Sequence, residues 1–81
     1  MYYKDIVIQS DLKYFRVSAK LTQQELADLV GCSCYMIQLL EAGKVVPNLK
    51  LAYAIAMVIG DRIDYRVLPT RIFKNLSLFY E

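Results

Sequence analysis

The sequence contains no histidine and only two cysteines among its 81 residues. Zinc sites take their ligands mainly from His and Cys side chains, and Cys32 and Cys34 alone supply too few. Histidine is also the most common general acid or base in enzymes. No clustered carboxylates and no nucleophile paired with a base take its place. We therefore expect no metal, no cofactor and no enzymatic activity.

Long apolar runs are also missing. The longest, from Leu51 to Gly60, has about half of the roughly 20 residues that a membrane-spanning helix needs. The N-terminal residues place Lys4 and Asp5 before a short apolar run, which does not resemble a secretory signal. We expect no membrane span and a cytoplasmic protein, in which both cysteines are free thiols.

The composition is apolar: 57% of the residues are hydrophobic, and the chain holds seven Tyr and three Phe. Such a chain is expected to be ordered, and 81 residues suffice for one core, so residues 1–81 are taken as a single domain. The apolar surplus exceeds what so small a domain can bury, which favours an oligomer. The net charge of +2 fits an ordinary solvated surface as well as a nucleic-acid binder.

The clearest local pattern lies between Thr22 and Ala42. Thr22 and Glu25 are spaced as a capping box, which predicts a helix with Leu26, Ala27, Leu29 and Val30 inward, ending at Gly31. Ser33 then caps a helix from Cys34 to Glu41 that has Ile37 and Leu40 on its apolar side and ends at Gly43. Two short helices joined by a glycine turn form a helix-turn-helix.

The other elements are predicted around this pair. A helix runs from about Leu12 to Ala19, and Asn48 caps a helix from Leu49 to Ile59 that is apolar nearly all round and ends at Gly60 and Asp61. Residues 62–67 favour a fifth helix, although their polar and apolar alternation also suits a strand, and Pro69 would end this element. The tail, residues 69–81, has helical spacing. A small strand pairing that involves residues 2–8 stays open.

The spacing within the helix pair has a geometric reason. Ala27 is small where the helices cross, Gly31 makes the turn, and Ile37 and Leu40 fill the wedge between the helices. Together with the segments 12–16, 21–27, 40–44 and 47–49, these residues resemble the Cro/CI-type, or xenobiotic-response-element-type, helix-turn-helix family of phage repressors and bacterial regulators. The resemblance covers residues 12–60.

The resemblance implies an all-α, compact five-helix lambda-repressor-like domain over residues 11–68, with a small terminal β element or an extra C-terminal helix left open. It places the third helix in the major groove of double-stranded DNA. Gln23 and Lys44 match phosphate-contacting positions, and Arg16 with Glu41 matches a scaffold pair that bridges the first and third helices. The residues implied at the DNA are Thr22, Gln23, Ser33, Cys34, Tyr35, Met36, Gln38, Leu39 and Lys44.

The resemblance further implies a transcriptional regulator of bacterial or phage origin, associated with the nucleoid. It would act as a homodimeric repressor on an inverted repeat. We expect the tail beyond Pro69 to hold the dimer together through Ile72, Phe73, Leu76, Phe79 and Tyr80.

The outward face of the third helix departs from the family pattern. Cys34, Met36 and Leu39 can touch thymine methyl groups but do not hydrogen-bond to base edges. An alternative therefore stays open, in which the helix-turn-helix is a protein-interaction module, antirepressor-like or antitoxin-like, with little DNA binding.

Overall fold

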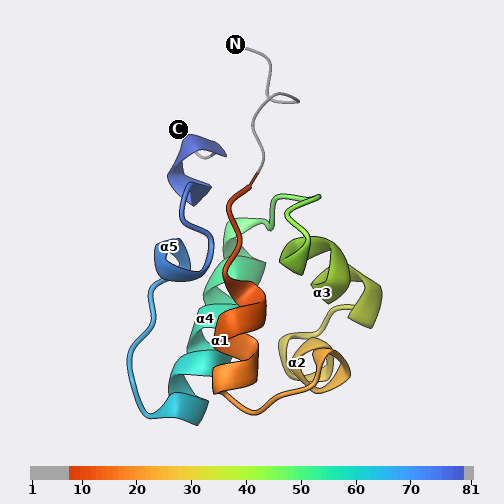
Figure 1. Cartoon of the computed structure of the whole chain (residues 1–81), viewed down its shortest axis with the longest axis vertical. Helices are drawn as coiled ribbons and strands as arrows, with labels where there is room; N and C mark the ends of the chain where they lie inside the picture. Colours follow the sequence, from red (N-terminus) through yellow and green to blue (C-terminus); the bar gives the residue numbers. More distant parts are fainter. Residues whose placement is uncertain (1–7, 80–81) are drawn as a thin grey trace.

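The computed structural model describes residues 8–79, and within them the fold is all-α, as predicted (Figure 1). No strand is present in this range, where one isolated antiparallel bridge joins Ser10 and Phe73. Residues 2–7, for which a strand pairing was left open, lie outside the described residues, as does Tyr80. The helices are α1 (Leu12–Ser18), α2 (Gln23–Val30), α3 (Cys34–Glu41), α4 (Leu49–Ile63), α5 (Pro69–Ile72) and the 3₁₀ helix η2 (Leu76–Phe79).

The helix-turn-helix forms as the caps predict. The Glu25 amide donates to the Thr22 hydroxyl at 3.0 Å, and the Glu25 carboxylate accepts from the Thr22 amide at 2.9 Å, so the capping box is complete. Gly31 ends α2 in the left-handed conformation with φ 79°. Ser33 accepts from the Met36 amide at 3.0 Å and so caps α3.

The end of α3 is a Schellman motif. Gly43 has φ 71°, and the next amide, that of Lys44, donates to the Leu39 carbonyl at 3.0 Å. This geometry satisfies carbonyl groups that the helix would otherwise leave unpaired. It also fixes the direction in which the chain leaves α3, with Lys44 directly after the turn.

The fourth helix is longer than predicted. Gly60 does not end α4, which continues to Ile63 and stops at Asp64 with φ 54°. The glycine serves a close approach instead, because a Cβ at Gly60 would lie only 2.9 Å from the backbone oxygen of Tyr65. The predicted fifth helix at residues 62–67 is therefore wrong, because this segment finishes α4 and then crosses back over it.

Pro69 begins a helix rather than ending one. It occupies the first turn of α5, where its missing N–H costs nothing and its fixed φ suits the helix. The chain then turns into the core, where Ile72 and Phe73 are fully buried. The Asp11 amide donates to the Ile72 carbonyl at 2.7 Å, and the Lys74 amide donates to the Gln9 carbonyl at 2.9 Å. These bonds join the two ends of the described chain.

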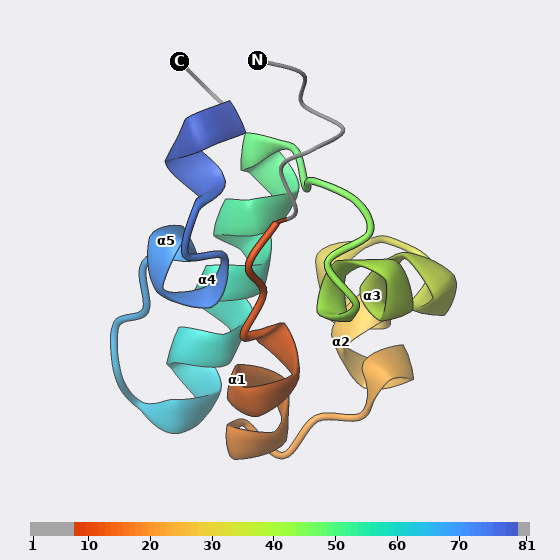
Figure 2. The same cartoon turned by 45° about the horizontal axis from the view of Figure 1, so that its top comes forward.

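The core is one cluster centred on α4, which lies between α5 and the α2–α3 pair in both views (Figures 1 and 2). Ile72, Phe73 and Leu76 belong to this cluster. Their prediction as dimer contacts is wrong, because their side chains are buried within one chain and cannot contact a second copy. The short helices leave space beside α4, and large apolar side chains from the tail fill it. Phe79 is half-buried.

The prediction that Leu29 points inward is wrong, because its side chain is exposed. The described part of the chain contains no helix that is both long enough and apolar enough to span a membrane.

Candidate nucleic-acid interface

Helix α3 separates its side chains cleanly between the core and the solvent. Ile37 and Leu40 are fully buried, whereas Tyr35 is 66% exposed. Gln38 is exposed, and Cys34 and Leu39 are half-buried on the outward side. Met36, which was expected beside them, packs partly against the core. The structure thus leaves an outward face on α3 consisting of Cys34, Tyr35, Gln38 and Leu39.

Thr22 caps the start of α2 and Ser33 caps the start of α3, and both residues are exposed. Thr22 and Ser33 use their oxygen atoms as acceptors for helix amides. The Ser33 hydroxyl therefore keeps its hydrogen for a further acceptor, such as a phosphate oxygen, whereas the Thr22 hydroxyl also interacts with the Glu25 carboxylate. The first amides of an α-helix also lack intrahelical partners and favour an anion.

Gln23 is held in a way that the sequence did not predict. Its side-chain nitrogen donates to the Glu41 carboxylate at 3.1 Å, which ties the start of α2 to the end of α3. In this conformation the side chain does not direct that nitrogen outward. A phosphate at this place would be met by backbone amides of α2, or by Gln23 after its side chain rotates.

Arg16 and Glu41 form the ion pair between α1 and α3 that the resemblance implied. The Arg16 Nε atom lies 2.5 Å from the Glu41 carboxylate, and the side chains are only 12% and 8% exposed. Arg16 also donates to the Leu21 carbonyl at 2.8 Å. The guanidinium thus joins α1, the segment before α2 and α3, and the pair holds the orientation of α3.

The cysteines sit on either side of Ser33 and are both free. Burial raises the pKa of the Cys32 thiol, and the neighbouring Cys34 raises it further. Cys32 packs against the core and stays protonated at neutral pH. Among residues 8–79, no three His, Cys, Asp or Glu side chains gather closely enough to hold a metal ion.

Lys44 lies directly after the Schellman turn that ends α3. It is exposed and places a positive charge at this end of the helix. The interface thus combines the outward face of α3 with one adjacent cation and the hydroxyl of Ser33. A family model described as helix-turn-helix matches residues 12–65, which is most of the chain. The chain belongs to the helix-turn-helix family.

This helix-turn-helix protein is of the Cro/CI type, so the family expectation is confirmed. A protein of Methanocaldococcus jannaschii, named as an uncharacterised HTH-type transcriptional regulator, is 42% identical over 57 residues, which cover 70% of this chain and 86% of that protein. One of Archaeoglobus fulgidus with the same description is 44% identical over 57 residues, covering 70% of this chain and 80% of its own length. Both of these relatives come from archaea. No solved structure shows significant similarity to the chain.

The sequence interpretation missed one surface of the helix-turn-helix protein. Helix α4 was expected in the core, yet Leu49, Tyr53 and Met57 are exposed. Their spacing of four residues, which places them on one face of α4 beside the buried Ala52 and Ala56, was the available signal.

Proposed function

We propose that the protein is a transcriptional regulator that binds double-stranded DNA, with α3 in the major groove. The outward face of α3 carries this proposal, because the helix is capped at both ends and held by Arg16 and Glu41, yet leaves Tyr35 and Gln38 in solvent. A major groove about 12 Å wide admits one α-helix. The relatives described as HTH-type transcriptional regulators support the regulatory role.

The phosphate contacts come from groups around α3. Lys44, the hydroxyls of Thr22 and Ser33 and the free amides at the start of α2 are all donors or cations. Such contacts set the position of the protein on DNA without reading its sequence. Because only one lysine directly follows α3, the sequence-independent part of the affinity is modest and depends on salt.

Base reading falls to the side chains of the outward face of α3. Gln38 is the residue that pairs best with adenine, through two hydrogen bonds, and the Tyr35 hydroxyl is the second polar group. Leu39 and Cys34 fit thymine methyl groups, with Met36 at the margin. We therefore expect a half-site rich in A·T base pairs.

The protein acts in the cytoplasm as a homodimeric repressor on an inverted repeat. One helix of eight residues contacts only a few base pairs, so a second copy is needed for a specific site. Two recognition helices in successive major grooves lie about 34 Å apart. A dimer bound in this way obstructs polymerase where the site overlaps a promoter.

The test is a binding titration in which the protein is added to the DNA upstream of its own gene. Binding is measured by fluorescence anisotropy at a series of salt concentrations. Lys44→Ala should weaken binding to every duplex and reduce the salt slope by about one. Gln38→Ala should cost about 1–3 kcal/mol at the specific site only. Arg71→Ala, which removes an exposed charge from α5 on the opposite side of the molecule (Figure 1), should change neither. An absence of binding to every duplex at low salt refutes the proposal.

The exposed side chains of Leu29 and Tyr35 favour one second candidate, a protein-interaction module. In that case a stoichiometric protein partner covers the outward face of α3, and Tyr35→Ala abolishes its binding. DNA affinity is then weak and insensitive to Gln38→Ala, which separates the two functions.

A further inference from the structure

The turn between α2 and α3 concentrates the sulfur atoms of the chain. Cys32 and Cys34 lie on either side of Ser33, and Met36 follows two residues later. These are three of the five sulfur-containing residues in the sequence, which has two Cys and three Met. DNA binding uses Cys34 only as an apolar group beside a thymine methyl and gives Cys32 no part. The two thiols are therefore reactive groups whose chemistry DNA binding does not use.

The backbone holds the two cysteines close together. Ser33 is extended, with ψ 155°, and one extended residue keeps the Cα atoms of its two neighbours within about 7 Å of each other. The Cys32 Sγ atom lies 3.5 Å from the Ser33 carbonyl oxygen, and this carbonyl is bonded directly to the Cys34 nitrogen. The sulfur of Cys32 thus lies beside the peptide group at which α3 begins.

Cys34 is held by a weak contact that it can exchange. The Gln38 side-chain nitrogen donates to the Cys34 Sγ atom over 3.9 Å, and sulfur is a weak acceptor. A single side-chain dihedral angle sets the position of a cysteine sulfur, and its staggered values are about 120° apart. Rotation about the Cα–Cβ bond of Cys34 therefore exchanges this contact for another without moving the backbone.

Cys32 is open to solvent through a groove. The groove, of about 340 Å³, lies between the end of α2 and the start of α4, and its lining includes Cys32, Val30, Asn48 and Leu51. Cys34 belongs to the outward face of α3, and both cysteines are half-buried. A small ion thus has a path to each sulfur atom while the helices keep their positions.

Two sulfur atoms without further ligands select a particular kind of ion. Structural zinc and iron–sulfur clusters take four ligands, and within residues 8–79 no third His, Cys, Asp or Glu side chain joins the pair. The expectation of no metal rests on this ligand count for zinc and does not extend to ions that take two ligands. Monovalent copper is soft, prefers thiolate sulfur and accepts linear coordination by two ligands.

The spacing of the cysteines also favours a metal bridge over a disulfide. A disulfide needs Cα atoms about 4.4–6.8 Å apart and sulfur atoms about 2.05 Å apart. The extended Ser33 places the Cα atoms near the upper limit of this range. A linear metal bridge separates the sulfur atoms by two metal–sulfur bonds, so it fits this backbone with less distortion.

We propose that Cys32 and Cys34 bind one Cu(I) ion between their sulfur atoms and that this ion weakens DNA binding. Each thiol loses its proton to solvent as its metal–sulfur bond forms. Two protons leave and one positive charge is bound, so the turn becomes more negative by one charge. Cys34 turns from Gln38 and from the thymine methyl toward Cys32, and the added negative charge lies beside the phosphate contact of Ser33. The protein then releases its DNA site, because phosphate contacts depend on the charge of the protein.

The metal site stands independently of DNA binding, and only its effect on DNA rests on the proposed function. Cu(I) binding is measured on the free protein, and DNA binding is measured on the metal-free protein. Failure of one measurement is therefore distinguishable from failure of the other.

The first experiment titrates the reduced full chain with Cu(I) in oxygen-free buffer against a chromogenic Cu(I) chelator. Native mass spectrometry should show one copper added and two protons lost, and Zn(II) should not displace the copper. Cys32→Ser and Cys34→Ser should each weaken Cu(I) binding on the order of a hundredfold or more, because one thiolate alone lacks the gain from a second linked ligand. Circular dichroism checks that both variants keep their helices.

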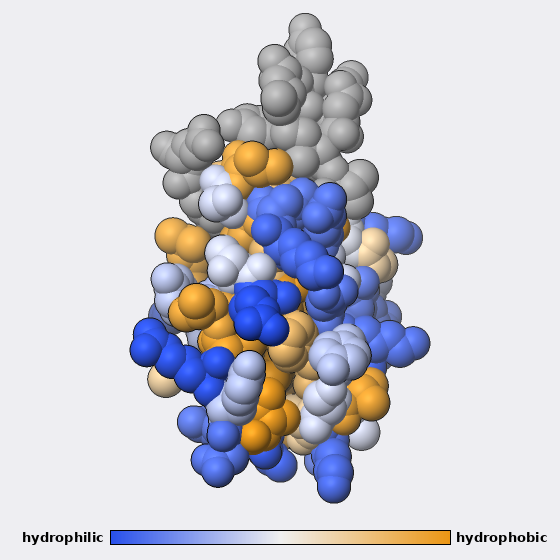
Figure 3. Space-filling view, turned by 60° about the vertical axis from the view of Figure 1, so that its left-hand side comes forward, coloured by the Kyte–Doolittle hydropathy of each residue, from blue (hydrophilic) through white to orange (hydrophobic). Residues whose placement is uncertain are grey.

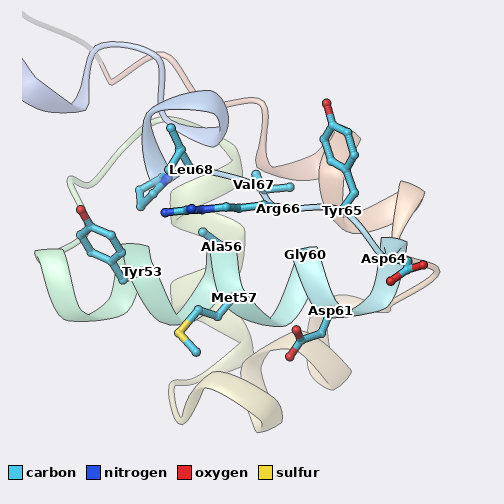
Figure 4. A pocket seen from close by; sticks show the side chains of 11 residues that line it. Tyr53, Ala56, Met57, Gly60, Asp61, Asp64, Tyr65, Arg66, Val67 and Leu68 are labelled. Carbon is cyan, nitrogen blue, oxygen red and sulfur yellow. The ribbon is translucent and has the colours of Figure 1, made fainter.

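Met57→Leu is the matched control for sulfur outside the turn. Met57 is 68% exposed and lines the groove between α4 and segment 64–69 (Figure 4). This groove lies on the side of the molecule away from α3, where apolar side chains are interrupted by strongly polar ones (Figure 3). Met57→Leu should leave Cu(I) binding unchanged. A Cu(I) affinity that either serine variant leaves unchanged overturns the metal site, as does an equal loss in Met57→Leu.

The second experiment measures the effect of Cu(I) on DNA binding by fluorescence anisotropy. One equivalent of Cu(I) should raise the Kd of the wild-type protein for its specific duplex on the order of tenfold, since a negative charge is added beside phosphate groups. Cys32→Ser keeps every proposed DNA contact, so it should bind the duplex as the wild type does and should not respond to Cu(I). An unchanged Kd in the wild type overturns the coupling, as does an equal response in Cys32→Ser.

Discussion

The Arg16–Glu41 pair offers the sharpest test of how α3 is held. Replacing Glu41 by Ala removes the acceptor for Arg16 Nε at 2.5 Å and for Nη2 at 3.4 Å, and leaves only the Leu21 carbonyl at 2.8 Å. Gln23 loses its acceptor as well. The guanidinium stays charged in a site where its side chain is 12% exposed.

Removing one partner of a buried ion pair costs about 3–5 kcal/mol, largely because the remaining charge is desolvated. Some water reaches Arg16, so we expect about 3 kcal/mol for Glu41→Ala, the lower end of that range. For a domain of this size the loss lowers Tm by about 12–24 °C. Glu41→Gln keeps an oxygen acceptor of the same shape and should cost less than Glu41→Ala.

Urea denaturation followed by far-ultraviolet circular dichroism measures these changes in the free energy of unfolding. The double variant Arg16→Met with Glu41→Leu removes both charges and keeps apolar volume, so its stability should return close to that of the wild type. A loss below about 1 kcal/mol for Glu41→Ala would place the pair in the range of solvent-exposed ion pairs and refute the reasoning. A double variant whose free energy of unfolding is no higher than that of Glu41→Ala would also refute it.

Two other predictions concern the boundaries of α1 and α2. Lys20 has φ 59°, a conformation that costs a side chain energy, so Lys20→Gly should raise the free energy of unfolding by about 0.5–1 kcal/mol. Lys13→Gly, within α1, should lower it by about 1 kcal/mol, and equal effects in urea denaturation would contradict this distinction. The pKa of Glu25 lies below its ordinary value of 4.5, first because the Thr22 amide donates to the carboxylate, then through the Thr22 hydroxyl, with a smaller contribution from Arg62. The folded state therefore binds fewer protons than the unfolded one, and the contribution of Glu25 to stability is complete above 4.5 and falls as the pH drops through the lowered pKa. Carboxyl NMR titration should show this pKa moving upward in Thr22→Val, which removes the hydroxyl but keeps the amide, and an unchanged value would argue against the hydroxyl as one of the causes.

Local signals were enough to predict most of the helix-turn-helix. The bounds of α3, the capping box of α2 and the glycine turns follow from side chains and backbone preferences within a few residues of each other. The Arg16–Glu41 contact came from the family resemblance, because local patterns carry no information about residues 25 positions apart. Gln23 shows the same limit, since its bond to Glu41 depends on how α2 and α3 are placed.

The region after Ile59 was predicted poorly because its structure depends on distant contacts. Gly60 signals a helix end by itself, but the approach of the Tyr65 backbone is what requires glycine there. Ile72 and Phe73 have the spacing of an interface helix, yet the space beside α4 and the bridge to Ser10 draw them inward.

The segment from Thr22 to Ala42 shows what the sequence by itself determined about this protein: two capped helices, the turn between them, and an outward face on α3 with few hydrogen-bonding groups. These features depend on interactions between neighbouring residues, which the order of amino acids states directly. Only the tertiary structure decided which of the remaining apolar side chains are buried, because burial depends on which surfaces the folded chain brings together. It placed the tail in the core and left Leu49, Tyr53 and Met57 on the solvent side of α4.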